Sequence, residues 1–147
     1  MTGAEAELKP RLLLDTHVLL WLMFGDAKLG AKAREAIHRA CREDRASVSA
    51  ITPWEIGVLV SKKRIDLYRN VLAWVRDALA LSGVTLSPLE PEIAVASTCL
   101  PWEMHADPAD RILVATARNL GATLVTADGA LLEFARQSHF VGMDAGV

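Results

Sequence analysis

Four acidic residues that are far apart in the sequence could form one metal site. Each stands where an apolar, strand-like run ends or where a helix is predicted to begin: Asp15, Glu55, Asp110 and Asp128. In an open α/β sheet the ligand crevice lies outside the carboxyl ends of the strands, so acids at these junctions can converge in the fold. Clustered carboxylates repel one another unless a cation supplies the opposite charge. The pattern therefore predicts an anionic pocket that holds a divalent cation.

The ligand chemistry of this pocket favours Mg²⁺ or Mn²⁺. These hard cations take oxygen ligands, and no histidine or cysteine pair in the sequence has the spacing of a zinc site. One or two such ions can activate a water, orient a phosphate and neutralise a leaving oxygen, so no protein nucleophile is needed. No nucleophile motif is present in the chain. The acids thus favour phosphodiester hydrolysis as the reaction class.

Helix capping is a second explanation for two of these acids. Thr52-Pro53-Trp54-Glu55 has the order of a capping box, with proline at the first helical position and an acid at the third. Asp107-Pro108-Ala109-Asp110 repeats that order, so Asp107 is interpreted either as a cap or as a fifth, supporting acid. Asp15 is not explained in this way, because an unpaired charge at the end of an apolar strand is costly to desolvate.

Strand and helix signals alternate along the chain. Strands are expected at 11–14, 47–51, 84–89, 122–126 and 140–141. Helices are expected at 17–24, 30–43, 68–81, 91–100, 112–120 and 129–135, with a further one opening at 52. Such alternation implies a parallel sheet covered by helices on both faces. We expect a disordered tail over residues 1–10 and a single domain over residues 11–147.

Composition narrows the class of protein. With 147 residues and a formal net charge of −2, the chain fits one domain that does not bind nucleic acid through bulk charge. The apolar fraction of 52% hints at a buried protein interface. Two cysteines, Cys41 and Cys99, are too few for a disulfide scaffold, so we expect reduced, mostly buried thiols and a cytoplasmic location. Neither a signal peptide nor a membrane span is expected.

Four segments of the sequence together resemble a known family. They are LLLDTHVLLW around Asp15, SVSAITPWEI around Glu55, HADPADRILVATA around Asp110 and LVTADGALLEF around Asp128. In this order they resemble the PIN domain and, within that family, the VapC-like toxins of bacterial toxin–antitoxin pairs. The resemblance implies a three-layer α/β fold with a central, mostly parallel twisted sheet flanked by helices.

The resemblance also implies an activity, partners and residue roles. The four acids would bind Mg²⁺ or Mn²⁺, and the activity would be metal-dependent endoribonuclease cleavage of RNA. A small antitoxin protein and a second copy of the chain, in a homodimer, would be the protein partners. Thr16 and Thr126 would be polar supports of the acids. Basic residues form the candidate contacts to the RNA backbone: Lys62, Lys63, Arg64 and Arg111.

Two other functions fit parts of the pattern. A catalytically silent PIN-like module would only bind its partner, and metal titration would separate it from an enzyme. A receiver-like signalling domain also binds Mg²⁺ with acids at strand ends, but it needs a phosphoacceptor aspartate after a middle strand and a lysine after a late one. In this chain Thr52 follows the strand at 47–51, and Ala127-Asp128 follows the strand at 122–126. The receiver-like alternative is therefore the weaker one.

Overall fold

The computed structural model describes residues 9–100, 104, 107–137 and 139–147. The prediction of a disordered tail over residues 1–10 falls mainly outside these residues. Within them, every strand and helix expected from the sequence occurs. The strands are β1 (Leu12–Leu14), β2 (Ala46–Ser49), β3 (Thr85–Ser87), β4 (Thr123–Thr126) and β5 (Val141–Asp144). The helices are α1 (Thr16–Phe24), α2 (Ala31–Arg42), α3 (Ile51–Ser61), α4 (Val71–Ser82), α5 (Pro91–Thr98), α6 (Pro108–Leu120) and α7 (Gly129–Arg136).

The strands form one parallel sheet in the order β3-β2-β1-β4-β5. The chain first builds outward from β1 through β2 to β3, and then returns to the other side of β1 with β4 and β5. Leu12 of the central strand lies opposite Ala46 of β2 and Thr123 of β4. The direction of winding reverses between β1 and β4, and in such sheets a ligand crevice opens outside the carboxyl ends of the strands at this point.

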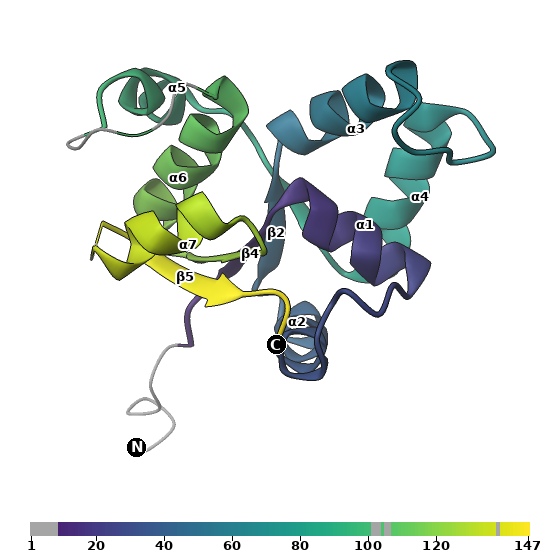
Figure 1. The fold of residues 1–147 in the computed structure, drawn as a ribbon, viewed down its shortest axis with the longest axis horizontal. Helices are drawn as coiled ribbons and strands as arrows, with labels where there is room; N and C mark the ends of the chain where they lie inside the picture. The colour runs from purple at the N-terminus through teal and green to yellow at the C-terminus, as the bar shows by residue number, and fades with distance from the viewer. Residues whose placement is uncertain (1–8, 101–103, 105–106, 138) are drawn as a thin grey trace.

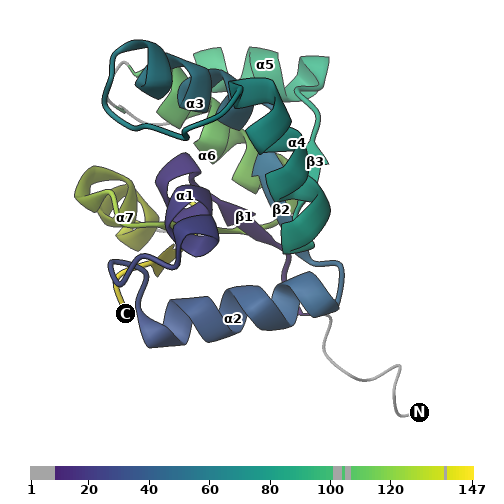
Figure 2. The ribbon, with the colours of Figure 1, turned by 90° about the vertical axis from the view of Figure 1, so that its right-hand side faces the viewer.

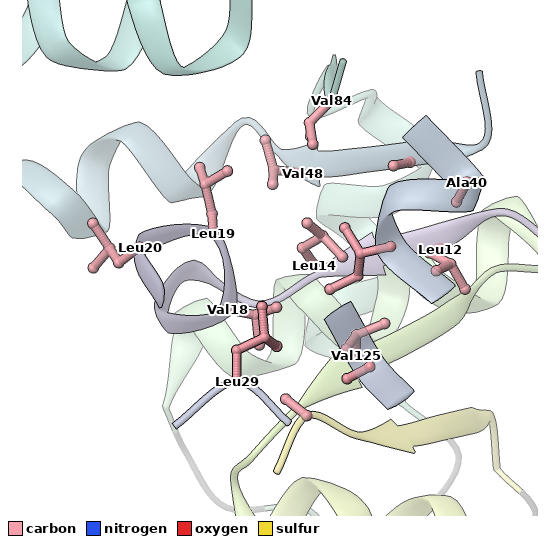
Figure 3. Close-up of a cluster of buried hydrophobic side chains, with 14 of the residues drawn as sticks. Leu12, Leu14, Val18, Leu19, Leu20, Leu29, Ala40, Val48, Val84 and Val125 are labelled. Atoms are coloured by element: carbon pink, nitrogen blue, oxygen red, sulfur yellow. The ribbon is translucent and has the colours of Figure 1, made fainter. Parts of the chain in front are cut away.

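Side chains of the central strand alternate between two hydrophobic cores. Leu12 and Leu14 pack with side chains of α1, α2, α3 and α4 on one face, whereas Leu13 packs with side chains of α6 and α7 on the other. Successive residues of a strand point to opposite faces, so an entirely apolar strand fills both cores. Figure 3 shows the first core, with Leu14 beside Val18 and Val125.

The helices therefore form two layers around the sheet, as the family resemblance implied. In Figure 1, α1, α3 and α4 lie to the right of the sheet, and α5, α6 and α7 lie to the left. Figure 2 shows α2 running below α1, on the same side as the first core. The expected three-layer α/β fold is confirmed, and all strand pairs among the described residues are parallel.

The predicted start of α3 is wrong by two residues, because the expected cap was Thr52 and the cap in the structure is Ala50. The difference affects the site. The helix begins at Ile51, whose N–H donates to Ser49 Oγ at 3.1 Å, and its N-cap residue Ala50 makes no side-chain capping bond. Thr52 is thus inside the first turn rather than at the cap. Glu55 is consequently not the acid of a capping box, and the structural explanation proposed for it is lost.

The predicted start of α4 at Tyr68 is also wrong. Asn70 Oδ1 accepts the N–H of Ala73 at 3.0 Å and caps a helix that begins at Val71. Tyr68 has a φ of 56°, outside the right-handed helical region. The asparagine cap was therefore the better helix start signal, whereas Gly83 ends the helix in the left-handed conformation as expected.

The last residues fold back over the start of α2. Gly30 N–H donates to Ala145 O, and Lys32 N–H donates to Val147 O, each at 2.9 Å. These contacts satisfy backbone donors that a helix start leaves without partners. A Cβ at Gly30 would lie 2.2 Å from the carbonyl carbon of Val147. Two backbones approach closely here, so glycine is required for space and not for its φ.

The cysteines differ from the expectation of buried thiols. Cys41 is half-buried and Cys99 is exposed, and both are free. Cys99 lies at the C-terminal cap of α5. None of the helices that the structure describes is long and apolar enough to cross a lipid bilayer.

Candidate metal centre

Asp15 lies at the point where the winding of the sheet reverses. It follows β1 directly, and its N–H donates to Val125 O of β4 at 3.0 Å. Its Oδ1 accepts the N–H of Thr16 at 2.7 Å, which caps α1. Its Oδ2 accepts the hydroxyl of Thr126, the last residue of β4, at 2.7 Å. Both carboxylate oxygens are therefore fixed by neighbouring elements at the carboxyl edge of the sheet.

Glu55 reaches the same place from α3. Thr16 Oγ1 donates to Glu55 Oε1 at 2.6 Å. Thr16 thus holds one acid through its backbone N–H and the other through its hydroxyl. Burial raises the pKa of Glu55 from 4.5 to about 7, and the negative charges of nearby acids add to this effect: Asp15, Asp110 and Asp107. The acids predicted from separate segments are therefore neighbours in the fold.

The two acids at the start of α6 both act on Glu55 electrostatically. Asp107 is the N-cap, as one of its two interpretations predicted, because its Oδ1 accepts the N–H of Ala109 at 2.9 Å and that of Asp110 at 3.3 Å. Asp110 is half-buried at the third helical position, whereas Asp107 is exposed. The cap therefore fixes the start of α6, and Asp110 in its first turn is near enough to raise the pKa of Glu55.

Asp128 is connected to Asp15 through Thr126. Its Oδ1 accepts the N–H of Ala130 at 2.8 Å and that of Leu131 at 3.1 Å, so it caps α7, a structural role that the sequence reading did not give it. Its N–H donates to Thr126 Oγ1 at 3.0 Å. Burial raises the pKa of Asp15, and the charge of Asp128 raises it further. Thr126 thus connects the two acids through one hydroxyl.

The chemistry of these acids fits a hard divalent cation. Asp15 and Glu55 accept hydrogen bonds from hydroxyls and a backbone N–H, and within the described ranges no lysine or arginine forms an ion pair with either. Burial is the main reason that the pKa values of both carboxyls are raised, and the charge of nearby acids adds to it. The hydrogen bonds at Asp15 and Glu55 bring together carboxylate and hydroxyl oxygens, and oxygens are the preferred ligands of Mg²⁺ and Mn²⁺.

The described side chains do not form a closed cage for a metal ion. Among the residues with described positions, no group of three or more His, Cys, Asp or Glu side chains is close enough to hold one ion. Mg²⁺ suits such a site, because it usually keeps several waters and binds through one or two carboxylates together with substrate phosphates. The pair formed by Asp15 and Glu55 is consistent with that mode.

The basic run follows the C-terminal end of α3, the helix that carries Glu55. Lys62, Lys63 and Arg64 are exposed where the helix ends. Glu55 and Lys62 are seven positions apart, so they share one face of the helix and are separated by about 10 Å along its axis.

Arg111 has a different environment from the basic run. Its Nε donates to Ser97 O at 2.9 Å and its Nη1 donates to Met104 O at 3.3 Å. These bonds connect α6 to the end of α5. Two of its nitrogens are thus used for backbone carbonyls of the described residues, unlike the side chains of the basic run.

Thr52 is a polar residue of the centre that sequence reasoning assigned to a cap. Its Oγ1 is buried and lies 2.9 Å from Thr16 Oγ1. The sequence did contain a signal for this position, because a residue three before Glu55 lies on the same face of a helix. The error came from placing the helix start two residues too late.

Comparisons with known proteins match nearly the whole fold. The family model described as PIN domain matches residues 12–137. Ribonuclease VapC22 from Mycobacterium tuberculosis is 35% identical over 120 residues, which are 82% of this chain and 88% of that protein. A toxin–antitoxin complex from Klebsiella pneumoniae contains a chain of 26% identity with a TM-score of 0.56, covering 88% of this chain and 95% of that one.

A second solved structure is similar at lower sequence identity. VapBC2 from Rickettsia felis, bound to a DNA fragment from its promoter, contains a chain with a TM-score of 0.66 and 15% identity, covering 90% of this chain and 96% of that chain. At this identity the likeness concerns the fold alone. It agrees with the parallel sheet and the two helical layers described above.

Proposed function

Because the chain belongs to the PIN-domain family, we propose that it is a metal-dependent endoribonuclease and the toxin of a toxin–antitoxin pair. The observation that carries this proposal is the contact network between two acids from different elements. Thr16 is hydrogen-bonded to both Asp15 and Glu55. A relative of 35% identity is a ribonuclease, and one similar solved structure is a toxin–antitoxin complex. Both findings support the proposal.

Asp15 and Glu55 would hold Mg²⁺ or Mn²⁺, with Asp110 and Asp128 as the further predicted ligands. A bound ion would activate water for attack on an RNA phosphodiester and neutralise charge on the leaving oxygen. The protein's own contribution is to orient the carboxylates, because Thr16 and Thr126 donate hydrogen bonds to them at 2.6 and 2.7 Å. Without a cation, Glu55 retains a proton up to a pH near its pKa of about 7.

RNA binding is proposed along α3, from the basic run toward Glu55. The exposed side chains of Lys62, Lys63 and Arg64 make no ion pair with any residue in the described part of the chain. They can therefore contact backbone phosphates without breaking an internal contact. Such contacts release counterions, so binding would weaken as the salt concentration rises.

The partner proposals rest on family membership. A small antitoxin would inhibit the enzyme by placing an arginine or a helix over Asp15 and Glu55, since a cationic group there would replace the metal. Homodimerisation and a cytoplasmic location are proposed on the same ground. Copurification with the product of a small neighbouring gene would support the antitoxin, and light scattering on the purified chain would measure its oligomeric state.

The direct test of the activity is RNA cleavage with and without metal. Purified protein is incubated with total RNA in Mg²⁺, in Mn²⁺ or in EDTA, and new 5′ ends are mapped. We expect cleavage only with metal, 5′-phosphate ends, and none with Asp15→Asn. Asp26→Asn is the matched control, because Asp26 also accepts a backbone N–H, from Lys28 at 2.9 Å, but does so in a turn outside the centre. Cleavage in EDTA or by Asp15→Asn would contradict the mechanism. RNA left intact by a metal-binding protein would favour the silent module.

A further inference from the structure

Thr52 makes an unusual hydrogen bond for a hydroxyl inside a helix. Serine and threonine in helices commonly donate to a carbonyl three or four residues earlier. Thr116 does so, with Oγ1 2.7 Å from Ile112 O, and Ser97 does so, with Oγ 2.7 Å from Ala94 O. Thr52 is 1% exposed, and the hydrogen bond that its Oγ1 makes is to Thr16 Oγ1 of a different helix, at 2.9 Å.

The direction of this bond follows from a count of protons. A threonine hydroxyl has one proton to donate and two lone pairs that accept. Thr16 uses its proton for Glu55 Oε1 at 2.6 Å. The proton between Thr16 and Thr52 must therefore come from Thr52 whenever Glu55 is ionised. The chain of donors then runs from Thr52 through Thr16 to Glu55.

We propose that Thr52 is a positioning residue for the metal centre, because it fixes the hydroxyl rotor of Thr16 so that its proton points at Glu55. This inference rests on the proposed nuclease function and assigns Thr52 a role in it. With Oε1 held in this way, Glu55 presents Oε2, which has no hydrogen-bond partner among the described residues. Loss of the Thr52 hydroxyl would release the rotor of Thr16 and with it the orientation of Glu55.

Three variants separate positioning from packing. Thr52→Val removes the hydroxyl and keeps the branched shape, whereas Thr52→Ser keeps the hydroxyl and removes a methyl group. Thr116→Val is the matched control, because Thr116 is also a buried helical threonine, 2% exposed, and its hydroxyl bonds only its own helix. A general loss of one buried hydroxyl bond would affect Thr52→Val and Thr116→Val alike.

The experiment measures Mn²⁺ binding by calorimetry for the wild type and the three variants. Partners that orient a metal ligand typically contribute about 10-fold or more to metal affinity. We expect Thr52→Val to bind Mn²⁺ about 10-fold more weakly, Thr52→Ser to stay close to the wild type, and Thr116→Val to match the wild type. RNA cleavage by Thr52→Val should need a correspondingly higher Mg²⁺ concentration and reach a similar maximal rate.

A crystal structure of metal-free Thr52→Val gives a readout that does not depend on metal. We expect the contact between Thr16 Oγ1 and Glu55 Oε1 to be lost. The inference is overturned if this contact persists, if Thr52→Val binds Mn²⁺ like the wild type, or if Thr52→Ser is as weak as Thr52→Val. A wild type that binds no Mn²⁺ would instead overturn the proposed function, and the role of Thr52 in it would fail too.

Discussion

Replacing Glu55 with glutamine should stabilise the metal-free protein at alkaline pH. Burial and neighbouring negative charges raise the pKa of this carboxyl from 4.5 to about 7. The unfolded chain therefore loses the proton at a lower pH than the folded chain does. Between these two pKa values the folded state binds more protons, so its stability falls as the pH rises and then levels off. Glutamine cannot ionise, and its amide oxygen can still accept the hydroxyl of Thr16.

The size of the effect follows from the shift in pKa. One pKa unit corresponds to about 1.4 kcal/mol, so the full shift would be about 3 kcal/mol. Glu55 is only half-buried, and solvent screening reduces this figure to about 1–2 kcal/mol. We expect Glu55→Gln to exceed the wild type by that amount at pH 8 and to match it near pH 4.5, where the wild-type carboxyl is protonated in the folded state.

Urea unfolding in EDTA at several pH values between 4.5 and 8 measures this difference. Glu35→Gln is the matched control, because Glu35 is a helical glutamate that accepts one side-chain hydrogen bond, from Arg39 at 3.3 Å, on an exposed surface. Its stability curve should run parallel to that of the wild type. The reasoning is refuted if the stability of Glu55→Gln changes with pH in parallel with that of the wild type, or if this variant is less stable than the wild type at pH 8. Either result would mean that ionisation of Glu55 does not destabilise the folded protein.

Three further outcomes are expected. Asp15→Asn should unfold in EDTA at the wild-type temperature or above, because it removes a buried charge; a fall of several degrees would contradict this. Gly30→Ala should lose about 1–3 kcal/mol of stability in urea unfolding, because the added Cβ would lie 2.2 Å from the carbonyl carbon of Val147, and an unchanged midpoint would refute the close approach. Alanine at all three positions of Lys62–Arg64 should weaken RNA binding and reduce its salt dependence, whereas Lys32→Ala should do neither; equal salt slopes for both would argue against RNA contact at the end of α3.

Local signals in the sequence were sufficient for the elements of the fold. The apolar run ending at Asp15 and the proline after Asp107 placed β1 and α6, because such signals act within a few residues. The prediction of where α3 starts was wrong. Thr52 has the residue type of a cap, but its hydroxyl is hydrogen-bonded to that of Thr16. A choice between local and distant partners for one hydroxyl depends on tertiary structure, which the pattern of a single segment does not contain.

The convergence of the acids depended on strand order. The hydroxyl of Thr126 and the carboxylate of Asp15 meet because β4 returns to lie beside β1. The two residues are 111 positions apart in the sequence. The general rule for acids at strand ends predicted a shared edge, but not which side chains would be bonded. The backbone contacts of Arg111 likewise depend on the tertiary structure. The cap formed by Asp128 is local, and the aspartate before Gly129 was a signal for it that the sequence prediction did not use.

The central claim is that Asp15 and Glu55 hold one metal ion together, each either directly or through a bound water. Anomalous diffraction from a crystal of the protein soaked in Mn²⁺ tests this claim most directly. We predict a Mn²⁺ peak within coordination distance of a carboxylate oxygen of Asp15 or Glu55 and bridged by water to the other, and no peak there in Asp15→Asn. A peak bound only elsewhere, or none at saturating Mn²⁺, would contradict the account.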